Sequence, residues 1–93
     1  GFPPHKKGRE KFFRALASYP TPIILFESPH RLLRAFTDIE RFLGERHLTI
    51  GRELTKIHEE IFRGSVSEAK RYFSQKGVRG EVVVVIAPPE GGM

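Results

Sequence analysis

The chain lacks cysteine and tryptophan, has a single methionine, and contains no long apolar run. Without cysteine it can form neither disulfides nor thiolate zinc sites, and a cysteine nucleophile is excluded. Its longest apolar run, residues 82–87, is strand-sized and far short of the roughly 20 residues that span a bilayer. The N-terminal residues lead into cations rather than an apolar core, unlike a signal peptide. We therefore expect a cytoplasmic protein with no membrane partner.

Recognisable catalytic and metal-binding patterns are also missing. The histidines at positions 5, 30, 47 and 58 share no metal-ligand spacing, and no HExxH motif occurs. Glycine-rich phosphate loops and the nucleophile elbow are absent as well. Glu59 and Glu60 are adjacent carboxylates, but neighbouring residues of a strand point to opposite faces, which opposes joint acid–base work. The sequence therefore indicates no metal site and leaves the catalytic residue unknown.

What the chain does contain is a globular composition with an uneven positive charge. Its 93 residues fit one domain, and 39% hydrophobic residues with eight phenylalanines are enough for a core. The net charge is +5, and the first fourteen residues hold only one carboxylate, Glu10, against five cations: Lys6, Lys7, Arg9, Lys11 and Arg14. Such a cluster attracts polyanions, of which nucleic acid is the commonest in the cytoplasm. A solubilising basic arm explains the cluster equally well.

Hydrophobic spacing predicts alternating helices and strands. Residues 8–18 read as a helix that buries Phe12, Phe13 and Leu16 and keeps Arg9 off that stripe. Residues 32–43 form the clearest amphipathic helix, and a capping box at 65–68 opens a third. Unbroken apolar runs at 23–26 and 82–87 read as strands covered on both faces. Residues 47–51 read as a strand, and 57–63 fit either type, with a strand favoured because the next helix follows at once.

This order predicts an α/β fold for residues 1–93 as a single domain. We expect a mixed sheet of about four to five strands flanked by three helices, with at least one antiparallel pair from the 52–63 region.

Two charged segments follow predicted strands. Residues 26–31 read Phe-Glu-Ser-Pro-His-Arg, and residues 51–56 read Gly-Arg-Glu-Leu-Thr-Lys. In open α/β sheets, ligands bind beyond the carboxyl ends of strands, where loops are exposed but rigidly held. Ser28 before Pro29 also predicts a helix start with Ser28 as N-cap. The alternative to a ligand site is that Ser28 serves only as an N-cap and that the charges in both segments are only solvated.

The same segments carry a family resemblance. Phe-Pro-Pro and Lys-Lys-Gly-Arg near the start, Glu-Ser-Pro-His-Arg at 27–31, Arg-Glu-Leu-Thr-Lys at 52–56 and Arg-Gly-Glu at 79–81 occur in order and at suitable spacing. The chain resembles, over essentially its whole length, the second domain of the ribosomal small-subunit RNA methyltransferase I group, in the tetrapyrrole methylase superfamily.

That resemblance implies S-adenosylmethionine as cofactor, held between two α/β domains of a class III methyltransferase. It further implies transfer of a methyl group to the 2′-hydroxyl of a cytidine in 16S rRNA of the small ribosomal subunit. The family's first domain is absent here, so the isolated chain is expected to be inactive, and a homodimer is an open expectation.

The implied site residues come from the two charged segments and the basic N-terminal cluster. Cofactor contacts are expected from Phe26, Glu27, Ser28, Glu53, Leu54 and Thr55. Phosphate contacts are expected from Lys6, Lys7, Arg9, Arg31, Arg52 and Lys56. Glu53 or Glu59 could act as the general base, but an equally good interpretation is that both carboxylates only pair with neighbouring cations. A tetrapyrrole (precorrin) methylase domain and a non-catalytic RNA-binding or dimerisation module remain as alternatives.

Overall fold

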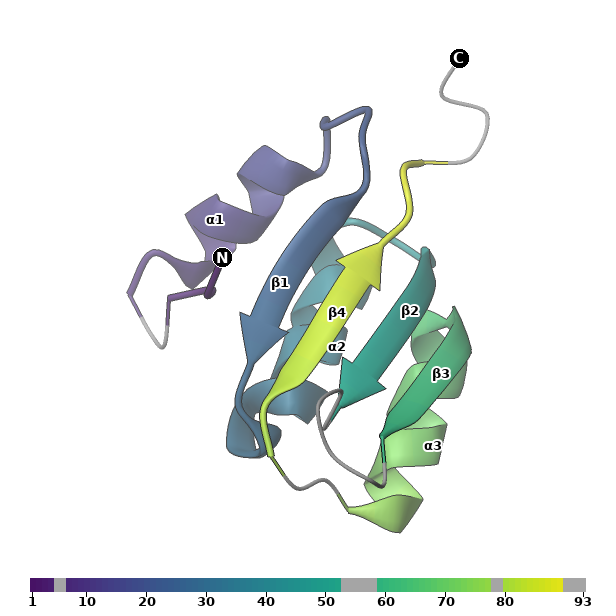
Figure 1. Ribbon diagram of the computed structural model, residues 1–93. Coiled ribbons are helices and arrows are strands. Elements are labelled where there is room, and N and C mark those ends of the chain that lie inside the picture. The colour runs from purple at the N-terminus through teal and green to yellow at the C-terminus, as the bar shows by residue number, and fades with distance from the viewer. Residues whose placement is uncertain (5–6, 53–58, 78–79, 90–93) are drawn as a thin grey trace.

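The computed structural model of the chain describes residues 1–4, 7–52, 59–77 and 80–89. Three α-helices, a short 3-10 helix and four strands alternate along it (Figure 1). Their order is α1 (Arg9–Leu16), β1 (Ile23–Glu27), η1 (Pro29–Arg31), α2 (Leu32–Phe42), β2 (His47–Arg52), β3 (Glu60–Ser65), α3 (Val66–Lys76) and β4 (Val82–Ile86). No described helix has the length and apolar character needed to cross a membrane.

The four strands form one antiparallel sheet in the order β1-β4-β2-β3. β4 lies between β1 and β2 and is antiparallel to both, so β1 and β2 run in the same direction. β3 pairs with β2, which confirms the antiparallel pair expected from the 52–63 region. The α/β class, the four strands and the three helices are confirmed, but the described pairing is antiparallel throughout rather than mixed. Each helical crossover joins two strands of one direction and leaves room between them for a strand of the opposite direction.

One face of the sheet carries the core. Figure 1 shows α2 and α3 behind the sheet, with α1 beside β1. The registers align two apolar rows on the helix side, which are Ile23–Ile86–Leu48–Gly64 and Leu25–Val84–Ile50–Phe62. Side chains from all three helices complete the cluster: Phe13, Leu16, Leu32, Phe36, Ile39, Val66, Ala69 and Phe73. Burying these side chains is the main favourable contribution to folding.

The opposite face is only partly covered. β1 and β4 alternate between buried and more exposed residues, and Ile24 is 53% exposed. The prediction that the 23–26 and 82–87 strands are covered on both faces was therefore wrong for the described chain. Unbroken apolar sequence predicts two-sided burial, whereas here the helices pack against one side.

Local signals at the helix ends agree with the sequence. The Ser65 hydroxyl accepts a hydrogen bond from the Glu68 backbone N–H, and the Glu68 carboxylate accepts one from the Ser65 N–H, as in a capping box. Gly44 follows the C-cap of α2 with φ of 92°, a left-handed conformation that glycine tolerates best. These caps set the entry of α3 and the exit of α2, and so hold β2 and β3 in place.

Candidate functional site

The carboxyl ends of β1 and β2 are level with each other. Glu27, the last residue of β1, and Arg52, the last residue of β2, both lie opposite Val82 of β4. Two interstrand spacings therefore separate them, or about 10 Å. Both strands therefore finish at the same end of the sheet, as expected from the sequence. Residues 53–58 lie outside the described part of the chain.

At this end the row facing the helices changes from apolar to charged. The registers place Glu27, Val82, Arg52 and Glu60 side by side, one row beyond Leu25, Val84, Ile50 and Phe62. Glu27 is only 2% exposed, and the side chains of Arg52 and Glu60 are largely buried. Buried charges are stable only when paired and hydrogen-bonded. We call this end of the sheet, with its ion-paired partners, the charged end row.

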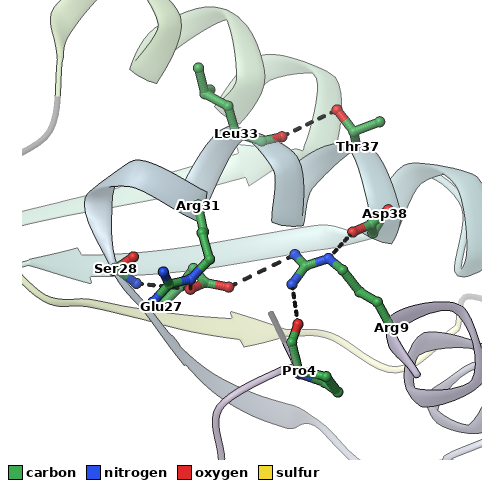
Figure 2. A network of polar contacts seen from close by, with 8 residues as sticks. All are labelled: Pro4, Arg9, Glu27, Ser28, Arg31, Leu33, Thr37 and Asp38. Atoms are coloured by element: carbon green, nitrogen blue, oxygen red, sulfur yellow. Dashed lines mark hydrogen bonds and ion pairs between the residues drawn. The ribbon is translucent and has the colours of Figure 1, made fainter. Parts of the chain in front are cut away.

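Glu27 is held by Arg9 of α1, by Arg31 of η1 and by the backbone of Ser28 between β1 and η1 (Figure 2). One carboxylate oxygen, Oε1, accepts hydrogen bonds from the Ser28 backbone N–H at 2.9 Å and from Arg31 Nε at 3.2 Å. The other, Oε2, lies 3.9 Å from an Arg9 guanidinium nitrogen. Arg9 also donates through Nε to Asp38 of α2 and through Nη1 to the Pro4 carbonyl at 2.6 Å. The network therefore ties α1, β1, η1 and α2 together directly beside the Glu-Ser-Pro-His-Arg segment.

A second ion pair holds the other half of the charged end row. Arg52 Nε lies 2.6 Å from Glu60 Oε1 across the β2–β3 pair, and the Tyr72 hydroxyl of α3 donates to Glu60 Oε2. The Tyr72 ring also packs on Phe62, with centroids 5.0 Å apart. Arg52 is thereby anchored to β3 and α3 at the point where the Arg-Glu-Leu-Thr-Lys segment begins.

Ser28 has the backbone of an N-cap but not the hydrogen bond of one. Its φ of −82° and ψ of 156° precede Pro29 at the first position of η1, which confirms the predicted helix start. Its hydroxyl makes no capping hydrogen bond, so the prediction of side-chain capping was wrong. The Glu27 carboxylate takes the Ser28 N–H instead. Within the described residues, Ser28 Oγ is buried without a hydrogen-bond partner, an arrangement that native structures seldom leave unexplained.

A wide hollow lies at the other end of the sheet and involves neither charged segment. Its volume is about 490 Å³, and Arg46, His47, Ser65 and Pro88 are among its lining residues. Arg46 is buried there and donates to the backbone carbonyls of Leu43, Ala87 and Ala17. These contacts connect the residues that follow α1, α2 and β4, so Arg46 has a structural role here. We therefore base the candidate site on the charged end row rather than on this hollow.

Comparison with known proteins identifies the relatives of this chain. It is 43% identical over 90 residues to the ribosomal RNA small subunit methyltransferase I of Thermotoga maritima, an alignment that covers 97% of this chain and 40% of the relative. The Synechocystis protein of the same name is 48% identical over 80 residues, covering 85% and 29%. The Bacillus subtilis protein is 37% identical over 81 residues, covering 87% and 28%. No family model matches the chain.

The chain is homologous to a portion of ribosomal RNA small subunit methyltransferase I. This confirms the resemblance drawn from the sequence motifs. The chain spans about 30–40% of the length of these methyltransferase I relatives.

The structure brings together part of the predicted methyltransferase site. Phe26, Glu27, Ser28 and Arg31 gather at the end of β1, and Arg52 ends β2 at the same level. Lys7 lies exposed just before α1. The remaining predicted residues, Lys6, Glu53, Leu54, Thr55 and Lys56, lie outside the described residues.

Arg9 requires a correction. We predicted a phosphate contact on the polar side of the first helix, but Arg9 is 4% exposed and its guanidinium is committed to Asp38, Pro4 and Glu27. A phosphate cannot reach it without breaking this network. The spacing of Arg9, Phe13 and Leu16, which is i, i+4 and i+7, would have placed it on the buried stripe.

Sequence reasoning also missed Asp38, Glu60 and Tyr72. The Tyr72 side chain reaches the surface, and its hydroxyl donates to Glu60. The partnership of Arg52 with Glu60 depends on the β2–β3 register, which no local pattern specifies. Period-two alternation did carry one usable signal, because Glu27 follows Ile23 and Leu25 on the buried side of β1.

Proposed function

We propose that this chain is the second-domain portion of an S-adenosylmethionine-dependent methyltransferase that modifies the 2′-hydroxyl of a cytidine in 16S rRNA. The observation that carries the proposal is homology to methyltransferase I relatives over 85–97% of the chain. The level ends of β1 and β2 support it, because Glu27 of the first motif and Arg52, the first residue of the second, lie at the same end of the sheet.

The residues at the end of β1 offer one clear group to a cofactor. The Ser28 N–H and the Phe26 N–H already donate within the chain, to Glu27 and to the Gly1 carbonyl. The Ser28 hydroxyl is buried without a described hydrogen-bond partner, as are Glu27 Oε2 and Arg9 Nη2, but those two atoms form an ion pair with each other. A ribose hydroxyl or a ring nitrogen of the cofactor's adenosine would satisfy the Ser28 hydroxyl. We therefore assign cofactor binding on this side to Ser28 and the backbone beside it, with the 53–55 segment as the second contact.

Phosphate binding falls to the cations that keep exposed donors. Lys7 is exposed, and the Arg31 side chain is 30% exposed although its Nε is bound to Glu27. A guanidinium has five N–H donors, so an arginine that uses one on a carboxylate retains others for a phosphate. Arg31 and Arg52 are also fixed by their carboxylates, which lowers the conformational cost of binding.

The chemistry asks mainly for positioning. When bound, the cofactor would supply a methyl group from its sulfonium sulfur to the ribose oxygen, which would lose its proton, and the transfer requires oxygen, methyl carbon and sulfur to be aligned. Holding the reactants in such a geometry supplies much of the rate in reactions of this kind. In this proposal the chain orients the cofactor at Ser28 and the RNA backbone at Lys7, Arg31 and Arg52. No residue is assigned as the base.

The other wall of the cofactor cleft belongs to the remaining length of the methyltransferase, and a homodimer is compatible with this arrangement. The isolated chain is therefore expected to transfer no methyl group. Incubation with labelled S-adenosylmethionine and undermethylated small subunits measures this directly, and label in the rRNA would overturn the assignment of half a site.

A chimera tests the proposed function itself. The matching 90-residue segment of the Thermotoga maritima methyltransferase would be replaced by this chain, and methyl transfer to small subunits would be measured. We expect retained transfer, and its loss on Ser28→Ala with unchanged folding. A folded chimera that binds RNA but transfers no methyl group would favour a non-catalytic RNA-binding module.

A further inference from the structure

Exposed cations gather where α1 and α2 lie side by side, away from the two charged segments. Arg14 of α1 and Arg41 of α2 flank the same phenyl ring, with guanidinium carbons 4.9 Å and 5.0 Å from the Phe42 centroid. Lys11 lies one turn before Arg14, and Arg34 lies two turns before Arg41, on the same side of each helix. We call Lys11, Arg14, Arg34, Arg41 and Phe42 the helix ridge.

The ridge has little negative charge of its own. Among the described acids of α1 and α2, Asp38 is bound to Arg9, and Glu40 lies 3.1 Å from Lys70 on the α3 side. Glu10 alone faces the ridge, 2.8 Å from Arg14, and both side chains of that pair are about 60% exposed. An ion pair so exposed contributes at most about 1 kcal/mol and is screened by salt. Arg14 can therefore exchange Glu10 for a stronger anion.

The geometry of Arg14 and Arg41 favours phosphate binding over a purely structural role. Two guanidinium groups from neighbouring helices lie beside one ring and repel each other, and an anion that contacts both offsets that repulsion. Both groups are preoriented by the ring, since cation–π contact holds the planar guanidinium in place. The bland alternative is that each arginine merely lies in the last turn of its helix, where a cation complements the helix dipole.

We propose that the helix ridge is a second RNA-binding surface, which contacts the phosphate backbone of the substrate away from the methylation site. The ridge runs along α2 from Arg34, one turn beyond Arg31 and the charged end row, to Arg41 near the other end of the helix. Seven residues of helix separate the two arginines, or about 10 Å. When the ribose to be methylated lies at the charged end row, phosphates of the same RNA strand would contact the cations of the helix ridge. The choice of RNA as partner rests on the proposed function.

Salt-dependent RNA binding by the 93-residue chain tests the ridge. The probe is a fluorescein-labelled RNA hairpin, followed by anisotropy between ~50 and ~300 mM salt. For Arg14→Gln/Arg41→Gln we expect about tenfold weaker binding at ~0.1 M salt and a salt slope flatter by about 1.4–1.8, which is the loss of two phosphate contacts. The control Arg63→Gln/Arg71→Gln removes the same charge from exposed positions on β3 and α3, and should change affinity less than threefold.

An equal loss of RNA affinity in Arg14→Gln/Arg41→Gln and in the control Arg63→Gln/Arg71→Gln would mean a general effect of net charge. That result would overturn the proposal that the helix ridge binds RNA. So would an unchanged slope for Arg14→Gln/Arg41→Gln, or an absence of RNA binding by the parent chain. If the ridge pair fails to fold, Lys11→Gln/Arg34→Gln removes two ridge charges that make no described ring contact, with the same expected slope. The chimera tests the proposed function separately from the helix ridge. An inactive chimera would contradict the proposed function but would leave a measured change in the salt slope unaffected.

Discussion

Arg9 provides the sharpest test of how the charged end row is held. Arg9→Met keeps an unbranched apolar stem but removes the guanidinium and its charge from a position that is 4% exposed. Asp38 loses its described cation, the Pro4 carbonyl loses a donor, and Glu27 keeps only Arg31 and the Ser28 N–H. The variant therefore leaves a buried carboxylate undercompensated rather than simply losing a contact.

The expected cost is about 3 kcal/mol. Removing one partner of a buried ion pair costs about 3–5 kcal/mol, and the lower value applies because Glu27 retains two partners and Asp38 is partly solvated. A chain of 93 residues has a free energy of unfolding of about 5–14 kcal/mol in total. The substitution should therefore remove a fifth or more of the stability and lower Tm by about 12–24 °C.

Urea unfolding at pH 7 and 25 °C measures this cost, provided that the slope m is equal in both proteins. Arg14→Met is the matched control, because it is the same change on the same helix in an exposed ion pair, with an expected effect below about 1 kcal/mol. Arg9→Met/Asp38→Leu should cost at least about 1 kcal/mol less than the sum of the single changes, because it removes the stranded carboxylate. A cost for Arg9→Met within about 0.5 kcal/mol would refute the network as a stabilising element.

Three further predictions concern other described residues. Ser28→Ala should leave the free energy of unfolding of the chain equal to or slightly above the parent value, because the hydroxyl makes no described hydrogen bond; a loss near 1 kcal/mol in urea unfolding would restore it as a cap. Hydrogen bonds from the Ser67 hydroxyl and N–H lower the pKa of Glu45 below its ordinary 4.5, and the Ser65 N–H and hydroxyl lower that of Glu68. Because both pKa values are lowered in the folded chain, the stabilisation by these carboxylates should be complete above pH 4.5 and should be lost as the pH falls below it. The free energy of unfolding should therefore depend less steeply on pH in this range for Glu45→Gln than for the parent chain. An equal dependence on pH would contradict the assignment. Gly64→Ala should destabilise by about 1–3 kcal/mol in the same unfolding assay, because the new Cβ would lie 2.9 Å from Glu68 Oε1 and 3.0 Å from Phe62 Cζ; a neutral result would mean that both side chains move aside freely.

Local patterns were sufficient for the three helices and for the family. The spacing of apolar residues located the three helices, and the capping box at Ser65 opened α3 at the predicted residue. These features depend on contacts within one or two turns of chain, so the sequence alone determines them. The two charged segments also indicated the family, because the order and spacing of motifs can be read from the sequence without knowing the fold.

Tertiary structure decided which charges are free to act. Arg9 carries the same charge as Lys7 two residues earlier, yet one is buried against Asp38 and Glu27 while the other is exposed. Ser28 looked like an ordinary cap until the Glu27 carboxylate was found on its backbone N–H. The partner of Arg9 comes from an element distant in sequence, because Asp38 lies 29 residues beyond it. The alignment of Glu27 with Arg52 likewise depends on β4, the last strand of the chain. Whether a side chain is solvated or ion-paired depends on the dielectric and the partners around it, and only the packed sheet and helices supply those.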